Sequence, residues 1–320
     1  MTPKERAVAA LRLKVPDMVP TFELEFQLEE EMFGKRFYTD DLLPDQFMKL
    51  SKKEREEKIF KLAEYMIEVY SKLEYSIIPC AYPGVWKEGI VPEETLLLIR
   101  YIRQMVGDTY MIHAHGDGTF AIPDGNDMYE FAYSIADDPE GMKAKAEKMA
   151  NIAIERNKRL AEAGVDTLIL CSDYCYNTGP FLSPEMFGEY IQPYLYKIID
   201  EARKDGLYTI KHTDGNIMPI LEQLVECKPH AIHSLDPMAK VDIKEVKKLV
   251  GDKVCLCGNV NCALMQTGTE QEVIESAEYC MTHAKPGGGY IFCTSNVPFK
   301  GLPPERYQLI LDVWKRMRNY

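Results

Sequence analysis

The sequence has no long hydrophobic run, no glycine-rich phosphate loop and no signal-peptide core. No apolar stretch approaches the ~18–20 residues that a membrane-spanning helix needs, and the charged start over residues 1–17 lacks the apolar region of a signal peptide. Neither G-x-G-x-x-G nor G-x-x-x-x-G-K-S/T occurs, which disfavours dinucleotide-binding and P-loop folds. We therefore expect no membrane association and a cytoplasmic location.

Closely spaced cysteine pairs are also missing. The chain has nine cysteines but no C-x-x-C pair, which argues against a structural zinc ribbon. With 320 residues, of which 46% are hydrophobic, it can bury a large core and needs no disulfide framework. We expect reduced thiols that pack as small hydrophobic groups, with Cys293 as the exception.

Positive charge is scarce as well. Lys and Arg number 38 against 50 Asp and Glu, which gives a formal charge of −12. Such a chain offers no basic stripe to the phosphates of a nucleic acid and is not attracted to anionic membranes. We therefore expect no nucleic-acid partner, although a single basic pocket within an acidic surface stays open.

The sequence does contain a regular alternation of strand-like and helical segments. Continuous apolar strands, each followed by a helix, are typical of a parallel sheet covered on both faces. Eight such units predict an α/β fold, a (β/α)8 TIM barrel. We expect one domain over residues 1–320, in which 1–73 contribute N-terminal helices and the first strand. The eight predicted strands are 18–22, 76–80, 109–114, 166–171, 208–211, 230–234, 254–257 and 290–293.

Polar side chains follow seven of these strands at their carboxyl ends, where a barrel carries its chemistry. Four of them suit zinc, because imidazole, carboxylate and thiolate are all zinc ligands: His212, Asp214, Asp236 and Cys293. His212 and Asp214 are two residues apart and share one side of an extended strand end. The competing interpretation is structural: His212 and Asp214 hold a turn, Asp236 caps the next loop, and Cys293 is a buried small residue.

Other strand-end residues are candidates for catalysis and for substrate binding. Asp173 directly follows an apolar strand, where a carboxylate must be solvated, paired or ligated. Tyr174 is a candidate to bond a substrate oxygen, and one of Glu23 and Glu25, with Glu25 preferred, is expected at the mouth as a general base or ligand. The alternatives are rim packing for Tyr174 and a salt bridge for Glu25. We further expect four residues to line the substrate site, with core packing as the alternative for each: Phe22, His113, His115 and Asn259.

These residues stand in segments that together resemble the uroporphyrinogen decarboxylase superfamily of distorted (β/α)8 barrels. The resemblance runs along nearly the whole chain, and it implies that fold with an N-terminal helical extension. The matching segments are Glu5-Arg6-Ala7, Pro16-Asp17-Met18-Val19-Pro20, Gly179-Pro180, Ser183-Pro184-Glu185-Met186-Phe187, Lys211-His212-Thr213-Asp214-Gly215-Asn216, His233-Ser234-Leu235-Asp236, Gly258-Asn259-Val260 and Gly287-Gly288-Gly289-Tyr290-Ile291.

The superfamily that the chain resembles has two chemistries. True decarboxylases position a polycarboxylate tetrapyrrole with an Arg-rich N-terminal segment, whereas residues 21–27 here carry Glu residues in place of cations. Cobalamin-dependent methyltransferases resemble one another in a zinc site built from His-x-Cys, a later acidic residue and a late Cys. His212, Asp236 and Cys293 match that pattern, and Asp214 replaces its first Cys. The resemblance therefore favours the methyltransferase branch.

The carboxylate at position 214 makes the expected site poorer in thiolate and better suited to an oxygen-bearing substrate. The resemblance thus implies a methyltransferase that demethylates a methoxylated, aromatic substrate and passes the methyl group to cob(I)alamin. Zn²⁺, or Asp173 or a tyrosine as acid, would stabilise the leaving oxygen. Five aromatic residues are expected to wall the substrate site, with core packing as the alternative: Phe22, Phe26, Tyr82, Trp86 and Tyr174.

The cob(I)alamin is expected on a separate corrinoid protein, because the chain lacks the D-x-H-x-x-G signature of cobalamin binding. Exposed aromatic residues would suit a homodimer. Three other functions stay open: a methylcobamide:thiol methyltransferase of the coenzyme M type, a decarboxylase related to uroporphyrinogen decarboxylase, and a non-catalytic barrel that binds a corrinoid partner or a ligand.

Overall fold

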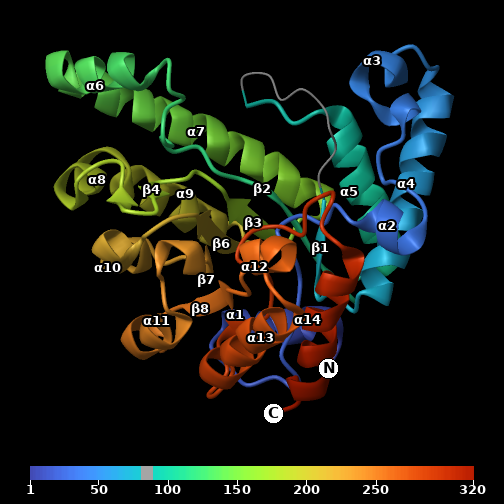
Figure 1. Ribbon diagram of the computed structural model, residues 1–320. Helices are drawn as coiled ribbons and strands as arrows, with labels where there is room; N and C mark the ends of the chain where they lie inside the picture. The colour runs from blue at the N-terminus through green and yellow to red at the C-terminus, as the bar shows by residue number, and fades with distance from the viewer. Residues whose placement is uncertain (81–88) are drawn as a thin grey trace.

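A curved sheet of parallel strands, surrounded by helices, forms the centre of the molecule (Figure 1). The computed structural model describes residues 1–80 and 89–320. Each neighbouring pair of strands in the sheet is parallel. In their order across the sheet, the strands are β1 (Ile77–Pro79), β2 (Met111–His115), β3 (Thr167–Leu170), β6 (Tyr208–Thr213), β7 (Ala231–Ser234), β8 (Cys255–Gly258) and β9 (Tyr290–Ile291). Seven of the eight predicted strands and the α/β barrel architecture are confirmed.

The remaining predicted strand, residues 18–22, forms isolated pairings instead of a regular strand. Thr21 pairs with Phe292 beside β9, and its carbonyl accepts a hydrogen bond from the N–H of Ser76 beside β1, at 2.7 Å. Pro20 has no N–H to donate to a ladder. The prediction of a strand is therefore wrong here, but the segment occupies the expected position and bridges the two edge strands of the barrel.

Helices cover the outside of the sheet, and in Figure 1 α4 lies beside α5. None of the helices in the described part of the chain is both long and apolar enough to cross a membrane. The helices are α1 (Pro3–Leu11), α2 (Glu29–Phe33), α3 (Pro44–Phe47), α4 (Lys52–Lys72), α5 (Glu93–Val106), α6 (Met128–Asp137), α7 (Pro139–Ala163), α8 (Pro184–Tyr190), α9 (Gln192–Lys204), α10 (Leu221–Glu226), α11 (Ile243–Val250), α12 (Cys262–Thr267), α13 (Glu270–Ala284) and α14 (Pro304–Met317). Three short 3-10 turns, η1 (Asp40–Leu42), η2 (Met218–Ile220) and η3 (Pro237–Ala239), and a hairpin of β4 (Cys175–Tyr176) and β5 (Gly179–Pro180) complete the elements.

The helical sequence after Ser183 is divided into two helices, α8 and α9. The Ser183 side chain accepts a hydrogen bond from the N–H of Met186 at 3.2 Å and so caps α8. Pro193 stands in the first turn of α9 and has no N–H for an i→i−4 bond. The chain therefore breaks at Ile191, between α8 and α9.

The interior of the barrel is packed with apolar side chains rather than open. Phe22, from the irregular segment, shares one buried cluster with inward-facing residues of the strands, and α1 adds Ala7, Ala10 and Leu11 to that cluster. The strand residues of the cluster are Ile77, Met111, Ile169, Ile210, Ala231, Cys255, Cys257 and Ile291. A packed interior leaves the strand ends as the place for chemistry.

A buried ion pair ties together the carboxyl-terminal ends of β2, β3 and β6. Lys211 of β6 is fully buried, and its ammonium donates to Asp117 Oδ2 at 2.8 Å and to the carbonyls of Leu170 and Ser172 at 3.1 and 2.9 Å. Burial alone would raise the pKa of Asp117, but the charge and hydrogen bond of Lys211 outweigh it and hold that pKa well below its usual value.

Glu23 anchors the irregular segment to the outer helix α14. It is buried, and its carboxyl group accepts hydrogen bonds from the Thr294 N–H, from the Thr294 hydroxyl at 2.5 Å and from the Tyr307 hydroxyl at 3.3 Å. Burial raises the pKa of Glu23 to about 8, and these hydrogen bonds oppose the rise. The carboxyl group is therefore protonated at neutral pH, which removes the cost of a buried charge.

We expect Glu23 to make the fold less stable as the pH rises from about 4.5 to about 8. In this window the unfolded chain loses the proton and the native chain keeps it, so the free energy of unfolding falls and then levels off. The free energies of unfolding of the native chain and of Glu23→Gln, measured with urea, should diverge by on the order of 3–5 kcal/mol between pH 4.5 and 9. The Gln variant should be the more stable of the two at pH 9. Glu64→Gln, at an exposed position of α4, is the control. If the free energy of unfolding changes with pH in the same way in native and Glu23→Gln protein, the raised pKa of Glu23 is contradicted.

Removal of the Lys211 charge should destabilise the fold far more than removal of an exposed one. Lys211→Met leaves Asp117 as an uncompensated buried carboxylate, so we expect a loss of about 3–5 kcal/mol in the free energy of unfolding. Lys53→Met, at the exposed ion pair with Glu57 on α4, should cost under about 1 kcal/mol. The double variant Lys211→Met/Asp117→Asn should recover part of the loss. A double variant whose loss of stability equals the sum of the two single losses would show that the two charges are not coupled.

Candidate functional site

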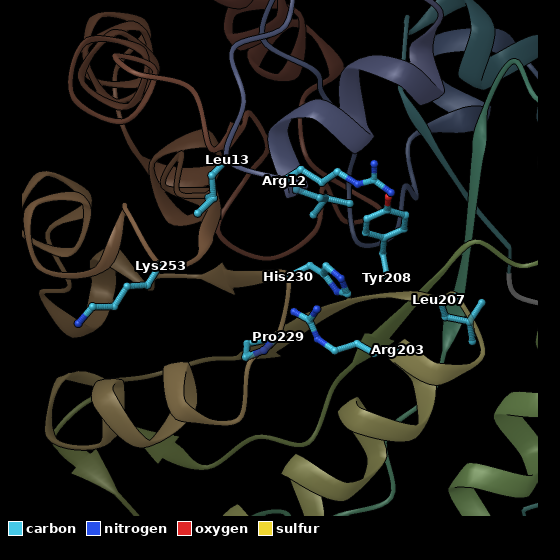
Figure 2. A pocket seen from close by; sticks show the side chains of 10 residues that line it. Arg12, Leu13, Arg203, Leu207, Tyr208, Pro229, His230 and Lys253 are labelled. Carbon is cyan, nitrogen blue, oxygen red and sulfur yellow. The ribbon is translucent and has the colours of Figure 1, made fainter.

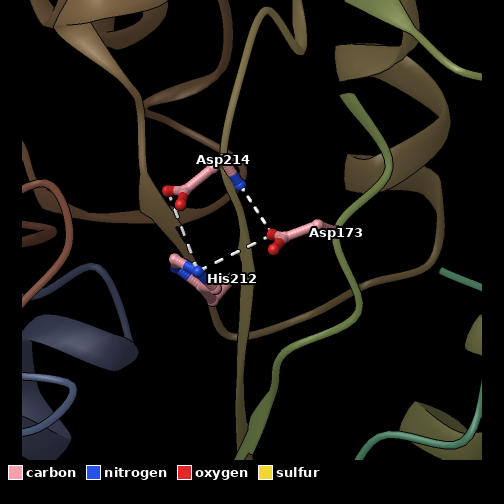
Figure 3. Close-up of side chains that lie close together, drawn as sticks. All are labelled: Asp173, His212 and Asp214. Atoms are coloured by element: carbon pink, nitrogen blue, oxygen red, sulfur yellow. Dashed lines mark hydrogen bonds and ion pairs between the residues drawn. The ribbon is translucent and has the colours of Figure 1, made fainter. Parts of the chain in front are cut away.

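Three side chains at the carboxyl ends of β3 and β6 form a compact group with metal-ligand chemistry (Figure 3). They are Asp173, His212 and Asp214, and one potential ligand atom from each lies within 4.8 Å of the others. His212 Nε2 is 3.8 Å from Asp173 Oδ1 and 3.8 Å from Asp214 Oδ1. Asp173 comes from the loop after β3, so residues about forty positions apart in the chain meet here, as strand ends of a barrel do.

The orientation of His212 is fixed by a second imidazole. His212 Nδ1 and His233 Nδ1 are 2.8 Å apart, and both rings are buried. Burial lowers the pKa of His212 to about 3, with a further contribution from the charge of Lys211, and it lowers the pKa of His233 well below the usual value. Both rings are therefore neutral, so one Nδ1 carries the shared proton. If His212 is the donor, its Nε2 presents a free lone pair to the two carboxylates.

The two carboxylates of the group differ in their surroundings. Asp214 Oδ1 accepts a hydrogen bond from the Ser234 hydroxyl at 2.7 Å, and Oδ2 accepts one from the Asn296 amide at 2.6 Å. Burial raises the pKa of Asp214 to about 6, and the neighbouring carboxylates of Asp173 and Asp236 raise it further, against the Ser234 hydrogen bond. The Asp173 side chain is 46% exposed and accepts the backbone N–H of Asp214 at 3.0 Å. Asp173 therefore faces the mouth, and Asp214 forms the inner wall.

This donor set fits a divalent metal ion. One neutral imidazole nitrogen and two carboxylates are ligands that Zn²⁺ accepts, and catalytic zinc sites hold three protein ligands and one open position. Metal-bound histidines usually engage their second nitrogen in a hydrogen bond, as His212 does, and metal-bound carboxylates are usually hydrogen-bonded too, as Asp214 is. With no thiolate among the three, the set is harder than the zinc sites that bind thiols.

The other two predicted metal ligands lie outside this group. Asp236 Oδ1 accepts the Met238 N–H at 2.8 Å, as the cap of η3, and Oδ2 accepts the Gly215 N–H at 3.3 Å. It therefore fixes the loop that follows Asp214. Cys293 is fully buried in the cluster that fills the barrel, and burial raises the pKa of its thiol well above the usual value. The structure brings Asp173, rather than Asp236 or Cys293, to the imidazole.

The two remaining predicted catalytic residues have different surroundings. Tyr174 is fully buried, its hydroxyl bonds the Thr119 hydroxyl at 2.5 Å, and its ring packs edge-on against Phe187 of α8. It supports the loop that carries Asp173. Glu25 is at the mouth, with a side chain that is 47% exposed and an oxygen 3.8 Å from His115 Nε2. Glu25 is therefore accessible to a substrate, and Tyr174 is not.

The predicted substrate-binding residues also divide into lining and structural ones. His115 is half-buried beside Glu25, and burial lowers its pKa. Phe22 and His113 are buried and pack edge-on, with ring centroids 6.0 Å apart, below the mouth. Asn259 is buried and donates to the Leu235 carbonyl at 2.6 Å, so it joins the loops after β7 and β8. Of these four, His115 is the one that reaches the mouth.

A cavity of about 480 Å³ opens beside Glu25, between the end of β1 and the N-terminal helices. Apolar and aromatic side chains make up much of its wall, with two acidic and two basic residues around them. Its lining is Glu25, Phe26, Gln27, Glu29, Arg36, Phe37, Tyr38, Met66, Tyr70, Pro79 and Lys300. Phe26 is thus the predicted aromatic residue that lines this wall, and the predicted Tyr82 and Trp86 lie outside the described residues. The size is typical of sites for small organic ligands.

Sequence reasoning did not assign three residues that complete the site. His233 orients His212, and Ser234 and Asn296 hold Asp214. The available signal was their position: His233 and Ser234 end one strand, and Asn296 follows another. Which of several strand-end residues face each other depends on the stagger of the barrel, and strand patterns do not encode it.

Comparison with known proteins agrees with this architecture. The sequence profile of the family described as uroporphyrinogen decarboxylase (URO-D) matches residues 122–317. The uroporphyrinogen decarboxylase of Photobacterium profundum is 25% identical over 185 residues, which are 55% of this chain and 48% of that protein. That of Pseudoalteromonas atlantica is 22% identical over 214 residues, 64% of this chain and 54% of the relative. The chain therefore spans about half the length of the curated relatives it matches.

A solved structure shares the fold over its whole length. The methyltransferase from Methanosarcina mazei superposes with a TM-score of 0.74 over 99% of both chains, at 17% sequence identity. This likeness establishes the barrel architecture, and the family profile covers more than half of the residues. The chain belongs to the uroporphyrinogen decarboxylase family.

Proposed function

We propose that this protein is a methyltransferase that removes the methyl group from a methoxylated aromatic compound and passes it to the cob(I)alamin of a partner corrinoid protein. The observation that carries the proposal is the group of Asp173, His212 and Asp214 at the mouth of the barrel. Its donor set is one imidazole and two carboxylates, which suits an oxygen ligand better than a thiolate. An ether oxygen is the atom that must take up charge when its methyl group leaves.

Zn²⁺ is the metal that this donor set suits, with Asp173, His212 and Asp214 as its ligands. When bound, the ion would act as a Lewis acid toward the substrate oxygen. The protein residues around it have separate tasks. By accepting the Nδ1 proton of His212, His233 would leave the Nε2 lone pair of His212 free for the ion, and Ser234 and Asn296 hold Asp214 in place. Because the pKa of His212 is lowered to about 3, its ring stays neutral and is not the acid that protonates the leaving oxygen.

The cavity beside Glu25 is the proposed binding site for the aromatic ring. Phe26, Phe37 and Tyr70 supply apolar and aromatic surface, and the cavity of about 480 Å³ has room for a substituted benzene ring. Glu25 belongs both to this cavity and to the mouth, where it lies 3.8 Å from His115. A ring seated here would have its methoxy group next to the mouth of the barrel.

The decarboxylase function of the curated relatives is the second candidate. The match to those relatives favours it, but the mouth of this barrel presents Glu25 and Asp173 to a substrate, and its buried Lys211 is engaged by Asp117. A tetrapyrrole with many carboxylates would be repelled by such a mouth. We therefore place decarboxylation second and include it in the test.

Metal content and methyl transfer should depend on the same three residues. We expect purified native protein to hold Zn²⁺, and His212→Ala and Asp214→Asn to lose most of it. Methyl transfer from methoxyaromatics to cob(I)alamin should fall by at least about 100-fold in both variants, since they remove stabilisation of the leaving oxygen. His283→Gln, in helix α13 away from the strand ends, is the matched control and should keep both properties.

Each alternative has its own signature in this experiment. Methyl transfer to thiols, without demethylation across a broad panel of methoxy compounds, would replace the proposal with a thiol methyltransferase. Release of carbon dioxide from uroporphyrinogen would replace it with a decarboxylase. Unchanged zinc content in His212→Ala would contradict the proposed ligand set even if demethylation occurs.

The KM of a negatively charged substrate should depend on the carboxylate of Glu25. A substrate carboxylate near the mouth would be repelled by the half-exposed carboxylate of Glu25, whereas a neutral ring would not. Glu25→Gln should therefore lower the KM of a methoxybenzoate about 3- to 5-fold and leave that of a neutral methoxyphenol unchanged. Exposed Glu64→Gln serves as the control for overall charge. Equal changes in KM for both substrates would show that Glu25 does not face the ring.

A further inference from the structure

A second cavity, of about 490 Å³, lies at the opposite, amino-terminal end of the barrel strands (Figure 2). It is formed where the end of α1 meets the residues that precede β6, β7 and β8. The residues that matter for its chemistry are Arg12, Arg203, Tyr208, His230 and Lys253. None of the described residues that line it is acidic, although the chain as a whole has a formal charge of −12.

The cations of this cavity have no carboxylate partner. Within residues 1–80 and 89–320, no Asp or Glu oxygen lies within 4.0 Å of a charged nitrogen of Arg12, Arg203 or Lys253, whereas many other lysines and arginines of the chain are ion-paired. Unpaired like charges around one hollow repel each other, and an anion would relieve that repulsion. The cavity is therefore electrostatically suited to an anionic ligand.

The arginines are held in place by neutral groups. The Arg12 guanidinium lies 5.7 Å from the centre of the Tyr208 ring, a cation–π contact. Arg203 donates from Nε and Nη2 to the carbonyl of Lys228 at 2.9 and 2.7 Å. Both side chains are thus oriented without being neutralised, and Arg203 keeps a terminal nitrogen for another acceptor. Lys253 points outward at the rim in Figure 2.

His230 adds a neutral hydrogen-bond donor to the two guanidinium groups. Its Nδ1 accepts the backbone N–H of Thr209 at 3.0 Å, so the proton of the neutral ring is on Nε2. Burial lowers the pKa of His230 to about 3, and the charges of Arg203 and Arg12 lower it further, so the ring stays neutral at physiological pH. Its ring lies 4.7 Å from that of Tyr208, and Figure 2 shows it between Tyr208 and Arg203.

We propose that this cavity is a binding site for a phosphate group, either free inorganic phosphate or the phosphoryl group of a small molecule. Two guanidinium groups and an imidazole N–H offer several donors and more than one positive charge, and the Lys253 ammonium adds positive charge at the rim. A phosphate dianion matches them, because it carries about −1.5 to −2 charge at pH 7 and three strong acceptor oxygens. A carboxylate offers one charge and two oxygens, so it would use the donor set less fully.

The position of the site separates it from the proposed reaction. Tyr208 starts β6 and His212 stands near its carboxyl end, so about 13 Å of strand separates the two at ~3.3 Å per residue. A phosphate bound at the amino-terminal end would therefore not compete with the substrate at the mouth. The proposal does not rest on the methyltransferase assignment, and it is tested without any activity measurement.

The test is calorimetric titration of the full chain with inorganic phosphate and, separately, with glycerol phosphate, both at constant ionic strength. We expect saturable binding of at least one of them, weakened at least about 5-fold in Arg12→Gln and about 10-fold in Arg203→Gln. Lys61→Gln, an exposed cation of α4 without an ion pair among the described residues, is the charge-matched control and should bind as the native protein does.

Two results would overturn the proposal. The first is heat that matches an equal ionic strength of sodium chloride, which would show general screening. The second is binding that survives unchanged in Arg12→Gln, a variant that removes no hydrogen bond of the fold among the described residues. Tighter binding of glycerol phosphate than of inorganic phosphate would identify a phosphorylated small molecule as the source, and the reverse order would identify the free ion.

Discussion

The buried contact between Lys211 and Asp117 is the constraint on which the site depends. A lysine ammonium with no exposure is tolerable only if its charge is paired and its protons are bonded. Asp117 and the carbonyls of Leu170 and Ser172 meet that demand together, and the Tyr174 ring closes the remaining side at 4.0 Å. These groups come from the ends of β2, β3 and β6, so a single charge fixes how three strand ends lie relative to one another.

That arrangement is transmitted to the metal-ligand group by strand geometry. Neighbouring residues on a strand point to opposite faces, so Lys211 on the outer face of β6 sets His212 on the inner face. On the β3 side, the Tyr174 N–H donates to the Thr213 hydroxyl at 2.8 Å, and the Asp214 N–H donates to Asp173 at 3.0 Å. The loop after β3 is thus bonded to the end of β6, and Asp173 is kept close to His212.

Part of the fold and part of the candidate site can be predicted from the sequence, and particular residues show why the other parts cannot. Seven strands were predictable because parallel strands are continuous apolar runs, whereas segment 18–22 depends on pairings with residues far away in the chain. His212 and Asp214 were predictable as neighbours from their two-residue spacing. Cys293 was expected beside them, but a strand-end position does not reveal how deep a side chain lies in the barrel, and Cys293 belongs to the packed interior.

The net charge of the sequence does not predict the charges around the two sites. A total of −12 says nothing about where the charges stand, and the surroundings of the two sites differ in charge. The mouth presents carboxylates to the proposed substrate site, namely Glu25, Asp173 and Asp214. Among the described residues, no carboxylate pairs with the cations that line the amino-terminal cavity. The two sites lie at opposite ends of the same parallel strands, so carboxylates gather at one and cations line the other. The acidic composition therefore describes only part of the surface, and β6, with Tyr208 at one end and His212 at the other, joins the two chemistries in one element.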